Sequence, residues 1–412
     1  MPDGMFLDSG RARDVSNASS EKFVRRSIMK TTVFCAIALT VTATCHAEES
    51  QGGPPPSGGT ATQVLSGLAG PVGLEFAQDG KMWISYAGPP VAPGAGGIGY
   101  FYTFGTPSVT EVINGYPTAC NPNTGECAGA WHITLNEDSS SPLQDTILLA
   151  AGGPPIPELA RIKIYKIGDG ELESTSDTAP SGTLMASEQA INVFSVLPNA
   201  LDTNLYSVAF DENNGRFLIV DAGANAILSY DVNGLAVFAE LDDVAQEVQS
   251  VPTRIISVPN DGAAGSLAFI VTELTGAPFT AGSATMWGFN NDGTKTALAT
   301  GLTTVVDCEY DADTNSVLFC SAGSFDFSSG IFAPFTGSIG RVDLSTGASE
   351  TLLDNLWMPA GIEKVDDAIY FTTFYAGGVF KFTPGGCNDP DINGDGVVDG
   401  QDLAALLAAW GS

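Results

Sequence analysis

The sequence predicts an all-β fold, a six-bladed β-propeller, on three observations. The composition is rich in turn-forming residues, with 48 Gly and 24 Pro in 412 residues, and it has no collagen period. Long stretches with the 3.6-residue apolar period of a helix are absent before the last residues. A motif of paired apolar strands recurs along the chain, which is typical of propellers and other repeat folds.

The clearest copy of the motif is GLAGPVGLEFAQDGKMWISYAG, residues 67–88. A turn with Gly, Leu and Pro precedes an apolar strand, and an Asp-Gly turn leads to a second one. Each copy holds two or three strands, and the segment that follows it supplies one more. The chain therefore predicts about six four-stranded blades. The remaining copies are residues 130–153, 204–234, 251–276, 303–323 and 358–386.

The two ends of the repeat array predict how the ring closes. The final copy lacks an outer strand, whereas TQVL (62–65) precedes the first copy without a partner. Pairing these two segments would close the ring and remove both exposed strand edges. A β-sandwich is the competing all-β fold, but it does not require one motif to recur. We therefore predict a propeller over residues 62–385.

Residues 1–47 have the features of a cleavable export signal. The apolar run TVFCAIALTVTAT is too short to span a bilayer, basic residues precede it, and small residues follow it. Either the natural start is Met29, so that residues 1–28 are a mis-assigned extension, or Arg25-Arg26 belongs to a twin-arginine motif. Both interpretations predict a periplasmic or extracellular protein with no transmembrane segment after cleavage.

Residues 48–61 are rich in Pro, Gly and Ser, which predicts a flexible linker. The chain has 16 Lys+Arg against 47 Asp+Glu, so its formal net charge is −31 at pH 7. Nucleic acids and anionic membranes need clustered basic residues, and this charge therefore argues against both as partners.

Export makes disulfides the expected state of the cysteines in the mature chain. Cys120 and Cys127 flank the turn-rich loop NPNTGE, and Cys308 and Cys320 lie on two apolar runs joined by the turn DADTNS. We predict one disulfide in each pair, which leaves Cys387 over. A metal site would need histidines or further thiols nearby, and the mature chain has one histidine.

The segment DINGDGVVDGQD (391–402) matches a twelve-residue calcium loop at every ligand position. Gly396 permits the sharp turn at the sixth position. Without a cation, the acidic side chains of this loop would repel one another strongly. The predicted Ca²⁺ ligands are Asp391, Asn393, Asp395, Val397 through its carbonyl, Asp399 and Asp402.

The residues behind the loop carry the apolar stripe of a short helix, at Leu403, Leu406, Leu407 and Trp410. Asp at the last loop position and the missing entering helix make residues 386–412 resemble half of a type I dockerin. That resemblance implies a cohesin-like partner. However, Gly400 and Gln401 replace the hydroxyl pair that usually contacts cohesin, so this partner is doubtful.

Equivalent positions at the start of each inner strand are expected to lie near the central channel, and a second ring includes Asp221 and Glu273. His132, Arg254 and Asp307 could bind a carboxylate- or phenol-bearing small molecule, with Asp221 and Glu273 as further candidates. The same three residues could instead form a buried ion network that joins the blades. The first ring consists of Gly73, His132, Ser207, Arg254, Asp307 and Gly361.

Five features occur in order along the chain. They are GLAGPVGLEFAQDG (67–80), the Cys120–Cys127 loop, NLYSVAF with IVDAGANAILSYDVNG (204–234), QSVPTRI with TELTGAPF (249–279), and the strand ending at Asp307. Together they resemble the secreted propellers of the scytonemin biosynthesis cluster, the ScyD/ScyE-type family. The resemblance implies an exported six-bladed, NHL-like propeller over roughly residues 62–384, and it specifies no activity.

These features favour an exported accessory or ligand-binding propeller with a calcium-binding tail and an unknown small-molecule or protein partner. The pairing of propeller and dockerin suggests a first alternative, a calcium-dependent hydrolase or lyase acting on a lactone or polysaccharide. Lactonase-type propellers hold a channel calcium with Glu, Asn and Asp, however, and the ring here offers Gly, His, Ser and Arg instead. A protein-interaction scaffold is the second alternative.

Calcium is expected to fold the tail, because metal binding neutralises and closes the acidic loop. Calorimetry should detect Ca²⁺ binding with a Kd of about 10⁻⁵ to 10⁻³ M. Chelation should change the tryptophan fluorescence while the propeller stays folded, and Asp391→Ala combined with Asp402→Ala should mimic chelation. Absence of calcium uptake at millimolar metal would contradict this prediction.

Overall fold

The computed structural model describes residues 41–42, 59–88, 96–116, 119–120, 127–152, 160–168, 171–174, 188–245, 248–259, 266–384 and 400–401. Antiparallel strands make up most of these residues, and Val193–Ser195 forms a 3-10 turn (η2). No helix among the described residues is long and apolar enough to cross a membrane.

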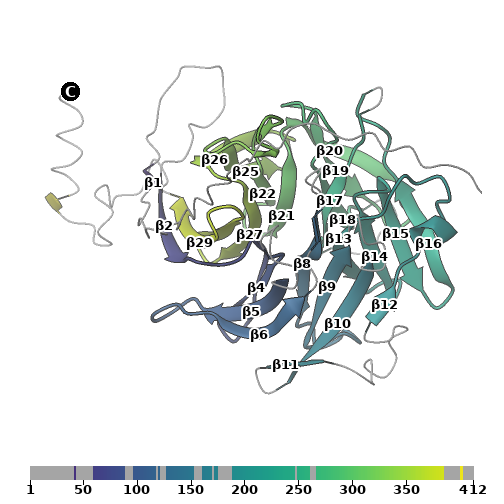
Figure 1. The fold of residues 1–412 in the computed structure, drawn as a ribbon, viewed down its shortest axis with the longest axis horizontal. Helices are drawn as coiled ribbons and strands as arrows, with labels where there is room; N and C mark the ends of the chain where they lie inside the picture. Colours follow the sequence, from purple (N-terminus) through teal and green to yellow (C-terminus); the bar gives the residue numbers. More distant parts are fainter. Residues whose placement is uncertain are drawn as a thin grey trace, which may run out of the picture. The chain divides into compact units, whose positions relative to one another are not determined.

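Six antiparallel sheets form the blades of a propeller (Figure 1). Blade 1 contains β3 (Pro71–Phe76), β4 (Lys81–Tyr86), β5 (Gly96–Tyr102) and β6 (Thr110–Tyr116). Blade 2 contains β7 (Ala119–Cys120), β8 (Cys127–Asn136), β9 (Thr146–Gly152), β10 (Arg161–Gly168), β11 (Glu171–Ser174) and β12 (Glu188–Ala190). Blade 3 contains β13 (Leu205–Asp211), β14 (Arg216–Asp221), β15 (Ala226–Asp231) and β16 (Gly234–Glu240).

The last three blades follow the same plan. Blade 4 contains β17 (Pro252–Ser257), β18 (Phe269–Glu273), β19 (Ala284–Phe289) and β20 (Lys295–Leu302). Blade 5 contains β21 (Val305–Asp311), β22 (Ser316–Ser321), β25 (Gly337–Asp343) and β26 (Ser349–Leu356), with an inserted hairpin of β23 (Phe325–Asp326) and β24 (Ile331–Phe332). Blade 6 contains β27 (Pro359–Val365), β28 (Ala368–Thr373), β29 (Gly378–Pro384), β2 (Gly59–Leu65) and β1 (Val41–Thr42).

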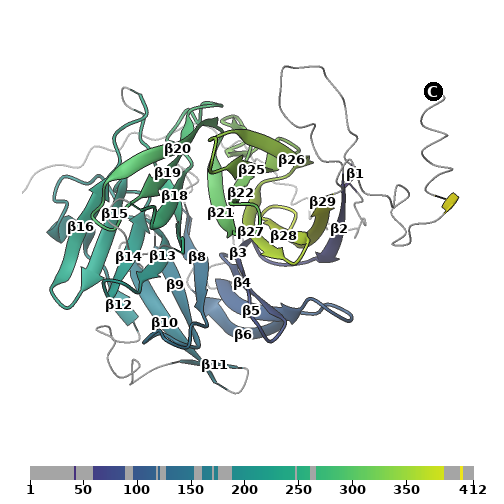
Figure 2. The same ribbon diagram turned by 180° about the vertical axis from the view of Figure 1, so that it is seen from behind.

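The innermost strands of consecutive blades lie side by side and close a ring (Figure 2). The neighbouring pairs are β3 and β8, β8 and β13, β13 and β17, β17 and β21, β21 and β27, and finally β27 and β3. Since the sixth pair returns to the first blade, the predicted all-β, six-bladed propeller is confirmed.

The ring is closed by the two ends of the propeller, as the sequence predicts. Strand β2 pairs antiparallel with β29, from Gly59 opposite Pro384 to Leu65 opposite Val379. The strand begins at Gly59, inside the segment that the composition assigns to a linker. Blade 6 therefore combines the first long strand of the chain with its last three.

Apolar side chains fill the spaces between blades, because alternate residues of a strand face opposite neighbours. Ile339 of blade 5 packs with Phe371 and Phe382 of blade 6, and all three are fully buried. Ile162 of blade 2 and Phe217 of blade 3 belong to a similar cluster. This packing holds the inner strands, and the residues they direct to the channel, in fixed positions.

The predicted disulfide between Cys308 and Cys320 is wrong, because both cysteines are free and buried. Across β21 and β22, Cys308 pairs with Phe319, and Cys320 pairs with Asp307. The two cysteines thus occupy adjacent register positions, whose side chains face opposite sides of the sheet. Cys308 packs towards blade 4, and Cys320 packs towards blade 6.

The other cysteine pair stays a prediction. Cys120 and Cys127 are backbone partners across β7 and β8, and their side chains lie outside the described residues. Most of the predicted export signal and the calcium loop also lie outside them. Within residues 391–402, only Gly400 and Gln401 are described.

Deletion of residues 61–66 should lower the melting temperature sharply, since it removes the strand that pairs with β29 and leaves the edge of β29 open. Deletion of residues 51–56, which precede β2, is the control and should leave the melting temperature unchanged. Thermal unfolding followed by circular dichroism measures both. A 61–66 deletion as stable as the parent would contradict closure by β2.

Candidate functional site

Every inner strand contains an irregularity in its pairing at the same place. In blade 4, for example, Pro252 pairs with Glu273, and the next pair is Ile255 with Val271, so the inner strand has one residue too many. Such a β-bulge bends the strand and redirects side chains. The irregularities lie between Pro71 and Leu74, Ala130 and Ile133, Leu205 and Ser207, Pro252 and Ile255, Val305 and Asp307, and Pro359 and Ile362. All six residues of the predicted channel ring lie within or at the end of these intervals.

A hydrogen bond between side chain and backbone joins each blade to the next near the bulges. The donors and acceptors are Ser85 Oγ to the Trp131 carbonyl, Thr134 Oγ1 to Val208 (2.7 Å), Ile255 N–H to Ser207 Oγ (3.3 Å), Thr253 Oγ1 to Val305 (2.9 Å), Ile362 N–H to Asp307 Oδ2 (2.9 Å) and Thr372 Oγ1 to Val72 (2.9 Å). The last of these closes the ring. At that junction, a Cβ on Gly361 would lie 1.8 Å from the Val72 carbonyl oxygen, so only glycine permits the approach.

Arg254 is the centre of the buried network. Its side chain is 5% exposed, and its Nη2 lies 2.6 Å from Glu75 Oε1. Its Nε lies 3.2 Å from Asp307 Oδ1. Its Nη1 donates to the Ile133 carbonyl at 2.9 Å and lies 3.3 Å from Thr134 Oγ1. One side chain of blade 4 therefore contacts blades 1, 2 and 5.

His132 lies beside this network and is 1% exposed. Its Nδ1 is 3.7 Å from Asp307 Oδ1, and its ring packs on Tyr206 with 5.1 Å between centroids. Neither ring nitrogen has a hydrogen-bond partner among the described residues. Burial, followed by the charge of Arg254, lowers the pKa of His132 well below its usual range, so the imidazole is neutral at pH 7.

Three glutamates lie two residues beyond the ring position in consecutive blades: Glu309 in blade 5, Glu363 in blade 6 and Glu75 in blade 1. Burial raises the pKa of Glu309 to about 8 and that of Glu363 well above its usual range. Burial also raises the pKa of Asp307 to about 7, although Arg254 opposes the shift. Glu309 and Glu363 therefore hold protons near neutral pH.

These three glutamates are not among the site residues predicted from the sequence. Residues i and i+2 of a strand share one face, so extending the alignment of the inner strands two residues past each ring position would have identified them.

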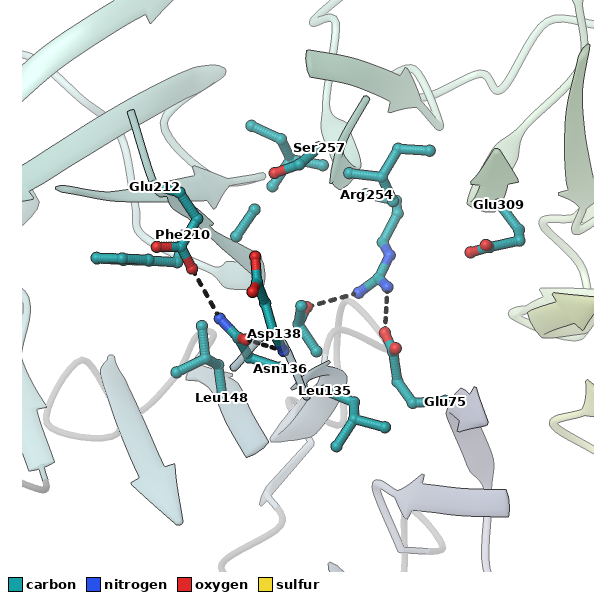
Figure 3. Close-up of a pocket in the computed structure, with 14 residues that line it drawn as sticks. Glu75, Leu135, Asn136, Asp138, Leu148, Phe210, Glu212, Arg254, Ser257 and Glu309 are labelled. Carbon is teal, nitrogen blue, oxygen red and sulfur yellow. Dashed lines mark hydrogen bonds and ion pairs between the residues drawn. The ribbon is translucent and has the colours of Figure 1, made fainter. Parts of the chain in front are cut away.

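A cavity of about 290 Å³ lies at the end of the channel where the inner strands finish (Figure 3). Arg254 and Glu75 interact on one side of it, and Asn136 Nδ2 donates to Glu212 Oε1 at 3.0 Å on the other. The Glu309 carboxylate points towards Arg254 and makes no interaction with the other residues drawn. The lining is Glu75, Thr134, Leu135, Asn136, Asp138, Leu148, Ala209, Phe210, Glu212, Arg254, Ile255, Ile256, Ser257 and Glu309.

The structure brings His132, Arg254 and Asp307 together as the sequence predicts, and it places Asp221 and Glu273 elsewhere. Asp221 accepts hydrogen bonds from Thr203 Oγ1 (2.6 Å) and from the backbone of its own blade. Glu273 accepts from the Ser250 hydroxyl, the Thr285 amide (2.6 Å) and Trp287 Nε1 (3.1 Å). Both carboxylates thus hold loops at the other end of the blades.

No family model matches the chain, and no curated protein matches it. The ScyD/ScyE-type resemblance and the dockerin resemblance therefore stay predictions.

Comparison with solved structures finds weak similarities. A Bacteroides thetaiotaomicron protein of unknown function has 10% identity and a TM-score of 0.49, over 80% of this chain and 73% of that chain. A catalytically inactive virginiamycin B lyase from Staphylococcus aureus has 16% identity and a TM-score of 0.43, over 78% and 98%. A Trichoderma reesei protein of carbohydrate-active family AA12 has 11% identity and a TM-score of 0.46, over 79% and 95%. Similarities this low say nothing about what this chain binds.

Replacing Arg254 with Met would leave the Glu75 and Asp307 carboxylates without their cation. We expect the free energy of unfolding to fall by about 3–5 kcal/mol, as for other broken buried ion pairs. Arg341→Met, which removes a partly exposed pair with Glu350, is the control and should cost less than about 1 kcal/mol. Urea unfolding at pH 7 measures both. Equal, small losses would contradict a structural role for the network.

Proposed function

We propose that the protein is an exported, non-catalytic binding propeller that takes a small cationic molecule into the cavity at the end of its channel. The observation that carries this proposal is the excess of acidic side chains over cations in the lining of the cavity. Among the lining residues, Arg254 is the only cation, against Glu75, Asp138, Glu212 and Glu309.

The guanidinium of Arg254 is not available to a ligand, because Glu75 and Asp307 already contact it. A carboxylate-bearing ligand, which the sequence analysis considered, is therefore disfavoured. Glu309 is the group that a ligand cation would neutralise. An ammonium or guanidinium at this position would replace the proton that burial leaves on the carboxyl near neutral pH.

The walls of the cavity define the rest of the ligand. Leu135, Phe210 and Ile256 supply apolar surface, and Thr134 and Asn136 supply hydrogen-bonding groups. At about 290 Å³, the space is near the lower end for small-molecule pockets. These features suit a compact amine with an apolar body.

The calcium tail belongs to the same proposal. Its six oxygen donors are of the hard type that Ca²⁺ prefers, and the apolar stripe behind them would anchor the propeller to a partner or surface when metal is bound. Export to the periplasm or beyond agrees with the leader-like sequence. Calcium is abundant outside the cell, which suits a loop of modest affinity.

n-Butylamine should bind, and butyrate, which is similar in size and opposite in charge, should not. Because Glu309 must lose its proton to pair with the amine, affinity should rise about tenfold between pH 7 and pH 9. Glu309→Gln should weaken binding at least tenfold at pH 9 and abolish this pH dependence. Titration calorimetry gives each Kd.

Glu240→Gln is the matched control, because Glu240 is exposed on the outer strand of blade 3. It should bind the amine like the parent. If Glu309→Gln also binds like the parent, or if butyrate binds as well as the amine, the cationic-ligand proposal is refuted.

A further inference from the structure

Two loops at the opposite end of the ring from the cavity extend beyond the ordinary blade. Residues 274–283 connect β18 to β19 in blade 4, and residues 322–336 connect β22 to β25 in blade 5. The same connection takes residues 87–95 in blade 1 and 153–160 in blade 2, and only residues 222–225 in blade 3 and 374–377 in blade 6. Insertions on one face of a repeat protein are often binding elements.

The two long loops meet through phenylalanine rings, which we call the aromatic surface: Phe279, Phe325, Phe327 and Phe332. Phe279 of blade 4 lies 4.9 Å from Phe325, 6.0 Å from Phe327 and 5.9 Å from Phe332 of blade 5, between ring centroids. Phe327 is 60% exposed, and Phe335 of the same loop is 56% exposed. Large apolar side chains are thus presented to solvent on a rigid base.

The loops hold this arrangement at a cost in backbone strain. Thr275, Phe279 and Phe335 have φ angles of 70°, 55° and 62°, a region that non-glycine residues seldom occupy. Hydrogen bonds within the loops hold them, including Ser283 Oγ to the Thr280 carbonyl (2.6 Å) and Thr336 Oγ1 to the Ala333 carbonyl (2.8 Å). The aromatic surface is therefore preorganised before a partner binds.

Asp326 lies between Phe325 and Phe327 in the sequence and adds a negative charge to the same loop. Hydrogen bonds from Ser328, followed by those from Ser329, lower its pKa to about 2, so the carboxylate is ionised at any physiological pH. A carboxylate next to aromatic faces favours a cation.

Other aromatic rings of this protein already have a cation of the chain beside them. Lys81 lies over Tyr100, Arg216 over Phe238, Lys295 over Trp287 and Lys381 over Tyr370, with distances of 4.8–5.8 Å to the ring centroids. Among the described residues, no Lys or Arg lies over a ring of the aromatic surface. The chain as a whole carries a net charge of −31, which attracts basic partners.

We propose that the aromatic surface binds a basic, apolar segment of a partner protein, with a Lys or Arg side chain over Phe327 beside Asp326. Apolar residues of the segment would cover the neighbouring rings. This site is separate from the cavity, so it does not depend on the proposed small-molecule ligand.

The probe is a labelled nonapeptide of alternating Leu and Arg, titrated into the full chain by fluorescence anisotropy at 150 mM salt. Phe327→Ser should weaken binding at least fivefold. Phe104→Ser is the matched control, since Phe104 is 64% exposed on blade 1, and it should bind like the parent. None of these variants changes the net charge, so non-specific attraction is the same in all of them. The same peptide with citrulline in place of Arg should bind the parent at least tenfold more weakly.

Equal binding by the parent and Phe327→Ser would overturn the proposal, because the peptide would then be held by charge alone. Equal binding of the citrulline peptide would show that the surface does not recognise a cation, and this would also contradict the proposal. If cellohexaose bound in a Phe327-dependent manner and the peptide did not, the surface would be a carbohydrate site instead, and the proposal would be refuted.

Discussion

A β-bulge repeated in all six inner strands is the constraint on which the rest of this structure depends. The extra residue in each strand bends the backbone, so that ring residues such as Arg254 and Asp307 come together at the channel. Near the same place, hydroxyl groups such as those of Thr253 and Thr372 donate to carbonyls of the next blade. The same bulge therefore both joins neighbouring blades and positions the channel residues, and it recurs in every blade.

The charges at the channel have a structural role and a proposed binding role, and different residues carry the two. Arg254 forms ion pairs with Glu75 and Asp307, and each of the three comes from a different blade. Buried ion pairs seldom add much net stability, but they are costly to break. A ring in which the blades were out of register would leave these three charges unpaired, so the ion pairs favour the correct register. Glu309 lies outside that balance, which is why the binding proposal rests on it.

Repetition explains why the fold was predictable from sequence. The recurrent turn and strand pattern identifies six blades, and the unpartnered TQVL segment identifies the closing strand. Aligning the copies also brings His132, Arg254 and Asp307 to one level, which the structure confirms. Asp221 and Glu273 belong to the same alignment, but loop amides and hydroxyls bind them within their own blades.

Other features could not be predicted, because they depend on a register that differs by one residue. The bulge at Asp307 shifts the pairing of β21, so Cys308 lies opposite Phe319 and away from Cys320. The contact between Phe279 and Phe325 could not be predicted for a different reason: it joins loops of different blades, and no local sequence pattern indicates it.

The closing blade also imposes an order on how the molecule is made. Strand β2 leaves the ribosome before any strand of blades 1 to 5, and its partner β29 comes last. Throughout synthesis, the edge of β2 is a free template for other chains, and the ring can form only when nearly the whole propeller is available. A truncated product would therefore keep an open edge, so completion of the chain acts as a checkpoint for assembly.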